Sequence, residues 1–242
     1  MKYFFFIVFF VFSVFGFAQE VQKARNFFED GNPKSAIQDL KLVLQKEPNN
    51  EEALSLMGEV FSYQKDWENA SNYYKKLVDL HPDNADYNFK YGGSLGLYAK
   101  TVNKFKAVFL VEDVKKHLTL AAAQDPNHIE VRWALVQLYL ELPSIIGGST
   151  AKAKAYAKEL EKVSPVDGAL TNGLIAEEEK DFSAAENYYK QAIAIGNSKL
   201  TYQKLVELYL KTDQLKKAKQ IAQVAFKETL EKEFLEQVKH IN

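Results

Sequence analysis

The chain has no cysteine among its 242 residues. Disulfides, thiolate metal sites, cysteine nucleophiles and lipid attachment through cysteine are therefore excluded. An excess of basic residues is also missing, since 31 lysines and arginines are matched by 32 acidic residues mixed along the chain. Without a basic stripe to neutralise phosphates, the sequence predicts no nucleic-acid binding. Stability must come from packing, and 47% of the residues are hydrophobic, which suits a folded core.

A long apolar run occurs at the N-terminus and is bounded on both sides. Lys2 precedes an apolar stretch over 3–15, and the small residues Gly16 and Ala18 come just before the polar Gln19. This three-part pattern is typical of a secretory signal peptide. The alternative is a transmembrane anchor, which needs about 20 apolar residues and is disfavoured by the shorter run. We expect residues 1–18 to be removed, leaving a mature chain of 19–242 without stable membrane insertion.

The phenylalanine-rich run resembles the signal peptides of Bacteroidetes-type bacteria. That resemblance implies a protein of the bacterial cell envelope, secreted across the inner membrane, with the periplasm as its destination.

Catalytic motifs are absent from the sequence. The four histidines, His81, His117, His128 and His240, have neither the spacing of a zinc protease nor a His-x-His pair. No nucleophile elbow, phosphate-binding loop or dinucleotide fingerprint occurs. The sequence therefore predicts no enzyme, no metal and no cofactor.

What the sequence has instead is a repeat. Pairs of matching residues lie 34 positions apart, among them Ala36 and Ala70, and Gly58 and Gly92. In the clearest unit, over 51–82, small residues such as Gly58 and Ala70 are expected where two helices cross closely. The proline at its end stops the second helix because proline lacks an amide proton.

The order of large, glycine, aromatic, alanine and proline positions resembles the tetratricopeptide-repeat (TPR) family. The resemblance implies an all-α solenoid of antiparallel helix pairs in a right-handed superhelix, with a concave face built from the first helix of each pair. It covers nearly all of 20–240, as one domain of about six pairs. We expect the last helix to run on through Phe234 and Val238 as a long polar-faced cap.

The period lengthens in the third and fourth repeats, where insertions are expected to carry function. In the third, glycines after Tyr91 are expected to permit a close approach to a helix or a ligand. An apolar stripe with helical spacing follows. It is either the core of two lengthened helices or the wall of a hydrophobic pocket, and its members are Phe105, Val108, Phe109, Val111, Val114 and Leu118.

The fourth repeat contains the loop 142–150, with Pro143, Gly147 and Gly148 before a helix that starts near Thr150. Ser149 is its expected N-cap. Two interpretations remain open for this loop. It is either a structural elbow with left-handed glycines or an anion site formed by exposed amides at a helix start.

The concave face is expected to be acidic with aromatic patches, which favours a basic or amphipathic peptide. Trp133 is the main contact candidate, with burial between repeats as the alternative. The leading hypothesis is a periplasmic scaffold that docks a protein or peptide in this groove. The alternatives are a small-molecule-binding accessory protein of a solute transport system, with a cavity in the enlarged repeats for an apolar ligand, and a structural oligomer. The candidate partner-binding residues are Phe89, Tyr98, Glu130, Trp133, Gln137, Ile145, Gly147 and Gly148.

Overall fold

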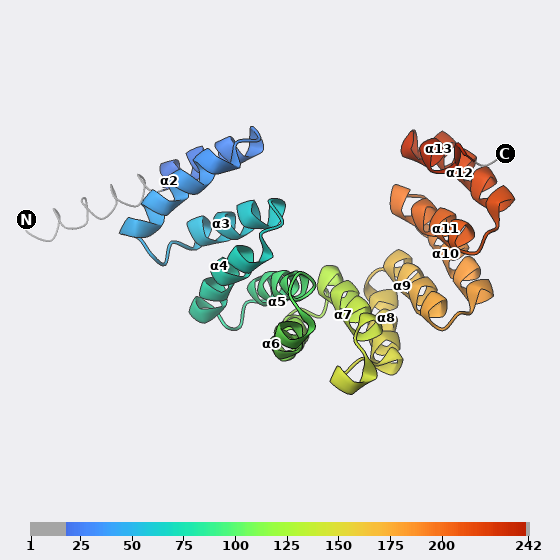
Figure 1. Ribbon diagram of the computed structural model, residues 1–242, viewed down its shortest axis with the longest axis horizontal. Coiled ribbons are helices and arrows are strands. Elements are labelled where there is room, and N and C mark those ends of the chain that lie inside the picture. The colour runs from blue at the N-terminus through green and yellow to red at the C-terminus, as the bar shows by residue number, and fades with distance from the viewer. Residues whose placement is uncertain (1–17, 241–242) are drawn as a thin grey trace, which may run out of the picture. The chain divides into compact units, whose positions relative to one another are not determined.

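The computed structural model describes residues 18–240, which contain helices and turns and no strand (Figure 1). The first helix covers 18–29 in the described part. The α-helices that follow are α2 (Pro33–Lys46), α3 (Glu51–Tyr63), α4 (Trp67–Leu80), α5 (Ala85–Ala99), α6 (Lys104–Gln124), α7 (Ile129–Glu141), α8 (Thr150–Val163), α9 (Pro165–Glu178), α10 (Phe182–Gly196), α11 (Lys199–Lys211), α12 (Leu215–Thr229) and α13 (Glu233–Val238), with the 3₁₀ helix η1 (Ser144–Ile146) after α7. The expected all-α solenoid of helix pairs is confirmed.

Short polar residues start most of these helices. The side chains of Asn50 and Asp66 accept hydrogen bonds from backbone amides in the first turns of α3 and α4. Ser149 does the same for α8, as expected, and Asp181 for α10. Each cap satisfies an amide that would otherwise have no partner within the helix.

The two helices of a pair cross where one of them has glycine. A Cβ atom added at Gly58 would lie 2.3 Å from Cε1 of Tyr74, and one at Gly173 would lie 2.3 Å from Cε1 of Tyr189. Both tyrosines are buried in the second helix of their pair. The bulky ring fills the space left by the missing side chain. The helices α3 and α4 therefore cross each other in the same way as α9 and α10 do.

The chain divides into two compact units, 1–126 and 127–242. In the first, the helix of 18–29 and α2 share a buried apolar cluster with α3, and α3 to α6 pack in chain order. In the second, α7 to α13 pack in chain order around a cluster that includes Tyr189, Leu205 and Phe234. The expected division into residues 1–18 and one domain of 19–242 stays a prediction.

Several turns between the helices of a pair have a residue in the left-handed conformation at the same place in the turn. The residues at this place are Gly31 in the first pair, Lys65 in the second, Lys180 in the fifth and Asp213 in the sixth, and their φ values are 75°, 59°, 62° and 57°. The residue after each donates its amide to the carbonyl five positions earlier, as Asp66 does to Phe61 at 2.9 Å. These bonds satisfy carbonyls at the end of the first helix.

The third repeat is enlarged because α6 has 21 residues, whereas α4 has 14. Gly92 meets α6 closely, since an added Cβ would lie 3.1 Å from Cγ of Leu118. The expectation of a close helix approach is therefore confirmed there.

The apolar stripe on α6 does not behave as one surface. Val111, Val114 and Leu118 are buried, as expected of a core. Phe105 and Phe109 are 84% and 82% exposed, so the core assignment is wrong for the first two turns, which also do not wall an enclosed pocket. The physical reason is that Phe105 and Phe109 lie on the side of α6 opposite Val111 and Leu118, so the six residues do not share one face.

The C-terminal helix also differs from the prediction. α12 ends at Thr229, because Leu230 adopts a left-handed conformation with φ of 60°. A separate helix of six residues follows, α13. Phe234 and Val238 are buried there, so the end of the solenoid is covered by a short turned-back helix and not by a long continuous one.

No helix within 18–240 is long and apolar enough to cross a membrane. The predicted signal peptide, except Ala18, lies outside the described residues, and its cleavage stays a prediction.

Candidate functional site

Three of the candidate contact residues share one face of α7. Glu130, Trp133 and Gln137 follow one another at helical spacing, with Glu130 and Gln137 exposed and Trp133 half-buried. Trp133 donates its indole N–H to Oδ1 of Asp167 on α9 at 2.7 Å. One side of the ring packs against the buried cluster of the second unit. The ring of Trp133 is held by the core on one side while part of it faces solvent, and its role as a contact residue stays a prediction.

Asp167 is in turn held by its neighbour, since Ser164 donates its hydroxyl to Oδ2 at 2.5 Å. The carboxylate thus accepts one bond from each side. A fixed aromatic ring of this kind loses little conformational freedom when it meets a partner, which favours a contact role.

The acidic residues of the first-helix faces already have partners within their own units. In the first unit, Glu59 lies 3.7 Å from both Arg25 and Lys90. In the second, Glu177 accepts from Lys211 at 2.9 Å and Glu207 from Lys204 at 2.8 Å. These faces are less negative than the sequence suggests. Exposed pairs of this kind are weak, about 0–1 kcal/mol each, so a charged partner can displace them.

Tyr98 supports the structure of the enlarged repeat. Its hydroxyl donates to Glu68 at the start of α4 and accepts from Lys106 in the first turn of α6. The Lys106 ammonium also lies 4.8 Å from the centre of the Tyr98 ring. This network fixes the first turns of α6 in place. Phe89 is half-buried on α5, the first helix of the pair that follows α3 and α4.

An aromatic ridge results on the outer side of α6, formed by Phe105, Val108 and Phe109. Val108 is 46% exposed, and the two phenylalanines are exposed almost fully. Phe105 and Phe109 stand one turn apart on the face opposite the buried Val111 and Leu118. A helix that is apolar on both sides is normally buried on both sides.

The loop of the fourth repeat is an elbow. The amides of Gly147, Gly148 and Ser149 donate to the carbonyls of Ser144, Pro143 and Tyr139 at 3.1, 3.0 and 2.9 Å. They are therefore not free to hold an anion, which rules out the anion site at these amides. Gly147 is left-handed with φ of 103°. A Cβ at Gly148 would lie only 1.7 Å from the carbonyl oxygen of Leu142, so only glycine fits.

Ile145 projects from this elbow with 91% exposure. It lies after the end of α7, separated from the face of Glu130, Trp133 and Gln137 by η1 and the turn before it. The elbow and the α7 face are thus distinct features of the second unit.

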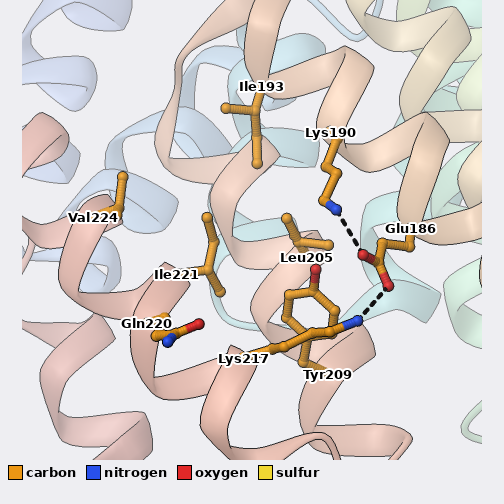
Figure 2. Close-up of a pocket in the computed structure, with 9 residues that line it drawn as sticks. All are labelled: Glu186, Lys190, Ile193, Leu205, Tyr209, Lys217, Gln220, Ile221 and Val224. Carbon is orange, nitrogen blue, oxygen red and sulfur yellow. Dashed lines mark hydrogen bonds and ion pairs between the residues drawn. The ribbon is translucent and has the colours of Figure 1, made fainter.

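An open cleft of about 480 Å³ lies between α10 and α12, above α11 (Figure 2). Its apolar wall is formed by Ile193, Leu205, Ile221 and Val224. At its other end the Glu186 carboxylate accepts from Lys190 at 2.6 Å and from Lys217 at 3.2 Å.

The Glu186 carboxylate is ionised in spite of partial burial. Burial alone would raise its pKa, but hydrogen bonds from Lys190, Tyr209 and Lys217 outweigh it and lower the pKa to about 2. Burial and the bond to this carboxylate raise the pKa of Tyr209. The sequence analysis missed this group. The i, i+4 spacing of Glu186 and Lys190 is visible in the sequence, whereas the third member, Lys217, comes from the next repeat.

An equivalent cleft of about 440 Å³ lies in the first unit, between α4 and α6 above α5. Asn88 and His117 form its base, with His117 Nδ1 2.7 Å from Oδ1 of Asn88. Asn88 donates its side-chain amide to the Pro82 carbonyl at 2.7 Å, which sets its orientation. The His117 Nδ1 is therefore the protonated nitrogen, and burial lowers the pKa of this histidine.

Residues 27–90 match the family model of the tetratricopeptide repeat. A solved tetratricopeptide repeat protein from Parabacteroides merdae superposes with a TM-score of 0.66 at 18% identity, over 88% of this chain and 80% of that one. YrrB, solved as a TPR protein with an unusual peptide-binding site, gives 0.55 at 15% identity over 75% and 87%. The fold is that of a tetratricopeptide-repeat protein.

The matches to curated proteins are partial. Intraflagellar transport protein 70A of Danio rerio is 30% identical over 96 residues, which is 40% of this chain and 15% of that protein. DnaJ protein P58IPK homolog B of Oryza sativa subsp. japonica is 27% identical over 170 residues, 68% and 34% of the two chains. The chain thus spans about a third or less of the length of these relatives.

The described part of the chain contains no group of three or more His, Asp or Glu side chains that could hold a metal. What its arrangement offers is contact surface, namely the α7 face, the α6 ridge and the two clefts. This chemistry suits binding.

Proposed function

We propose that the protein is a non-enzymatic scaffold that docks another protein, and that the aromatic ridge on α6 is its main contact. The exposure of Phe105 and Phe109 carries this proposal. Apolar side chains gathered at one exposed place, rimmed by polar residues, mark interaction sites on soluble proteins. The Tyr98 network links the first turn of α6 to α4, so the backbone that carries the ridge is held in place before a partner binds.

The partner of the ridge is proposed to present an apolar pocket edged by acidic residues. Lys100, Lys104 and Lys106 lie beside the ridge in the sequence, and no acidic residue occurs between Tyr98 and Val111. Opposite charge at the rim of an interface speeds association and selects the partner. A ridge only two turns long fits a pocket better than a flat surface.

For the first-helix faces we retain a basic or amphipathic peptide as the proposed guest, with Trp133 as its contact. Because the acidic groups there are paired, the electrostatic attraction is weaker than the sequence implies. The transport-accessory alternative loses the observation that supported it, since Phe105 and Phe109 face solvent.

Site-specific photo-cross-linking in intact cells of the source organism tests the ridge. A photoreactive phenylalanine analogue is placed at 105 or 109, and at Tyr63, which is 68% exposed in the same unit, as the matched control. We expect one distinct protein adduct from 105 and 109 that is missing from 63. Replacing both phenylalanines with serine should weaken binding of the purified adduct partner by about 30-fold or more.

Trp133→Ala is the parallel variant for the first-helix face, with Asp167→Asn as its control because that change keeps the ring. If Trp133→Ala abolishes the adduct and the double serine variant does not, the docking surface is the groove and the ridge proposal is wrong. Adducts with lipid alone, or with a second copy of the chain alone, contradict it as well.

We further propose that the mature protein acts in the periplasm. The N-terminal pattern of charge, apolar run and small residues supports this. Mass spectrometry of the protein from fractionated cells tests it. A chain that begins at Gln19 in the periplasmic fraction is expected, and a chain that keeps Met1 to Ala18 in the cytoplasm contradicts it.

A further inference from the structure

The cleft between α10 and α12 has an excess of positive charge beside an apolar wall. Its lining contains two ammonium groups, on Lys190 and Lys217, and one carboxylate, on Glu186. α12 carries more basic residues over 215–227 and no acidic one before Glu228. Figure 2 shows the ammonium groups of Lys190 and Lys217 each reaching one oxygen of Glu186, one from above and one from below, with Leu205 closer to them than Ile193 and Ile221.

We propose that this cleft binds an acidic amphipathic segment of another protein. A glutamate or aspartate side chain of the segment lies between Lys190 and Lys217, and an apolar side chain next to it packs on Ile193, Ile221 and Val224. The inference is independent of the ridge on α6, which belongs to the other unit.

The lysines have donors left for a second carboxylate. Each ammonium group carries three N–H donors, and its bond to Glu186 uses one. The Lys190 and Lys217 side chains are 55% and 48% exposed, so an incoming group can reach them. Glu186, whose side chain is only 17% exposed, holds both in place in advance.

The apolar wall completes the recognition. Ile193 and Ile221 are half-buried, and Val224 is 43% exposed at the surface. A side chain placed across them removes apolar surface from water on both partners. Small-molecule sites bury most of their ligand, whereas Val224 and Gln220 leave this cleft open along α12. A protein segment lying across the opening therefore fits better than a small fatty acid.

Binding of three labelled probes to the full mature chain tests the proposal by fluorescence anisotropy. Two are synthetic amphipathic peptides with the same leucine positions, one with glutamate and one with lysine at the flanking positions. The third is a fluorescent dodecanoate. We expect the glutamate peptide to bind at least 10-fold more tightly than the lysine peptide. We expect the dodecanoate to bind more weakly than the glutamate peptide.

Variants locate the binding. Lys217→Glu and Ile221→Asp should each weaken the glutamate peptide by 10-fold or more, while Lys116→Glu in the equivalent cleft of the first unit should have no effect. Glu186→Gln should tighten it about 3-fold, because the two lysines then have no competing carboxylate. Circular dichroism verifies that each variant is folded.

Equal affinity for the two peptides, or an affinity that Lys217→Glu leaves unchanged, overturns the proposal. Tighter binding of dodecanoate than of the glutamate peptide would assign the cleft to a small apolar acid and overturn it as well. None of these outcomes depends on the cross-linking at Phe105.

Discussion

The two clefts lie at equivalent places in their units and differ in net charge and in the polarity of their base. Each lies between the second helices of consecutive pairs, above the first helix of the later pair. In the first unit His117 stands directly before the buried Leu118, and in the second Ile221 stands directly before the buried Ala222. The same positions therefore line both clefts.

Part of the lining is alike, since Lys75 and Lys190, Val78 and Ile193, and Leu120 and Val224 occupy matching positions, and the difference lies in the other residues. The first cleft has Lys75 bonded to Asp79 at 2.8 Å, and its base is the hydrogen-bonded Asn88 and His117. The second has isoleucines and a valine, with lysines in excess. A glycine packed under a tyrosine ring occurs once in each unit, at Gly58 and at Gly173, so the same frame tolerates a polar or an apolar base in the cleft beside it. The predictions below test that separation of frame and cleft.

The largest effect is expected from Asn88→Ala. Asn88 is fully buried and holds Pro82, Asn84, Gln124 and His117 through its side chain. Removing it leaves several polar groups without a partner, which should lower the free energy of unfolding by about 3 kcal/mol.

Urea unfolding followed by circular dichroism measures this change. The control is Tyr202→Phe at the equivalent position of α11, which removes one hydroxyl bond to Asn197 and should cost about 1 kcal/mol. Equal losses in the two variants would mean that the hydrogen bonds of Asn88 contribute no more to stability than the single hydroxyl bond of Tyr202.

Gly58→Ala and Gly173→Ala test whether the two frames are the same. In each, the new methyl group would clash with a buried tyrosine ring at 2.3 Å, and we expect each to cost about 2 kcal/mol. Gly93→Ala is the control, because a Cβ there meets nothing within 4 Å. If one of the two variants costs nothing in the same unfolding assay, the units are not equivalent at their helix crossings.

Glu186→Gln should lower stability at pH 7 by about 1 kcal/mol, since the carboxylate bonds to two lysines and Tyr209 are weakened. The folded pKa is about 2 against an ordinary value of 4.5. Because the folded pKa is the lower one, the stabilisation is present above pH 4.5 and is lost as the pH falls toward 2. The difference between wild type and variant, measured by urea unfolding at pH 7 and at pH 3.5, should shrink at the lower pH. A constant difference would show that charge is not its cause.

His117→Gln should have the smallest effect on the free energy of unfolding, and the effect should appear as a change in how that free energy depends on pH. Burial lowers the pKa of His117 from its ordinary value of 6.5. The unfolded chain therefore takes up a proton below pH 6.5 that the folded chain resists, and the wild type should lose stability as the pH falls from 7.5 to 5.5. The variant should lack this loss, whereas His240→Gln, at an exposed position, should keep it. The second cleft has isoleucine here and no such dependence.

The frame was predictable because it depends on a pattern along the chain. The spacing of Gly58 and Ala70 predicts a close helix crossing, and the structure places a tyrosine ring on the glycine. Ser149 was predictable as an N-cap for the same reason, since the capping bond joins residues three apart. Features that lie within one helix or one turn can be read from local sequence.

The contact surfaces were predictable only in part. Trp133, Glu130 and Gln137 share a face because helical spacing decides it. Helical spacing already places Phe105 and Phe109 opposite Val111 and Leu118 on α6, but which of the two sides is buried depends on packing against other helices. The cleft around Glu186 needs Lys217 from another repeat, and the break at Leu230 depends on one backbone conformation of an ordinary leucine. Placement between helices decides these features.

The left-handed turns have a consequence for engineering heat tolerance. The first pair uses Gly31 where later pairs use Lys65, Lys180 and Asp213, in the same conformation. An L-residue there has a strain of about 1 kcal/mol that glycine avoids. Exchanging the three for glycine, one turn at a time, should raise the melting temperature in small and separate steps. The glycine in the turn of the first repeat thus shows which substitution would make the corresponding turns of the later repeats more thermostable.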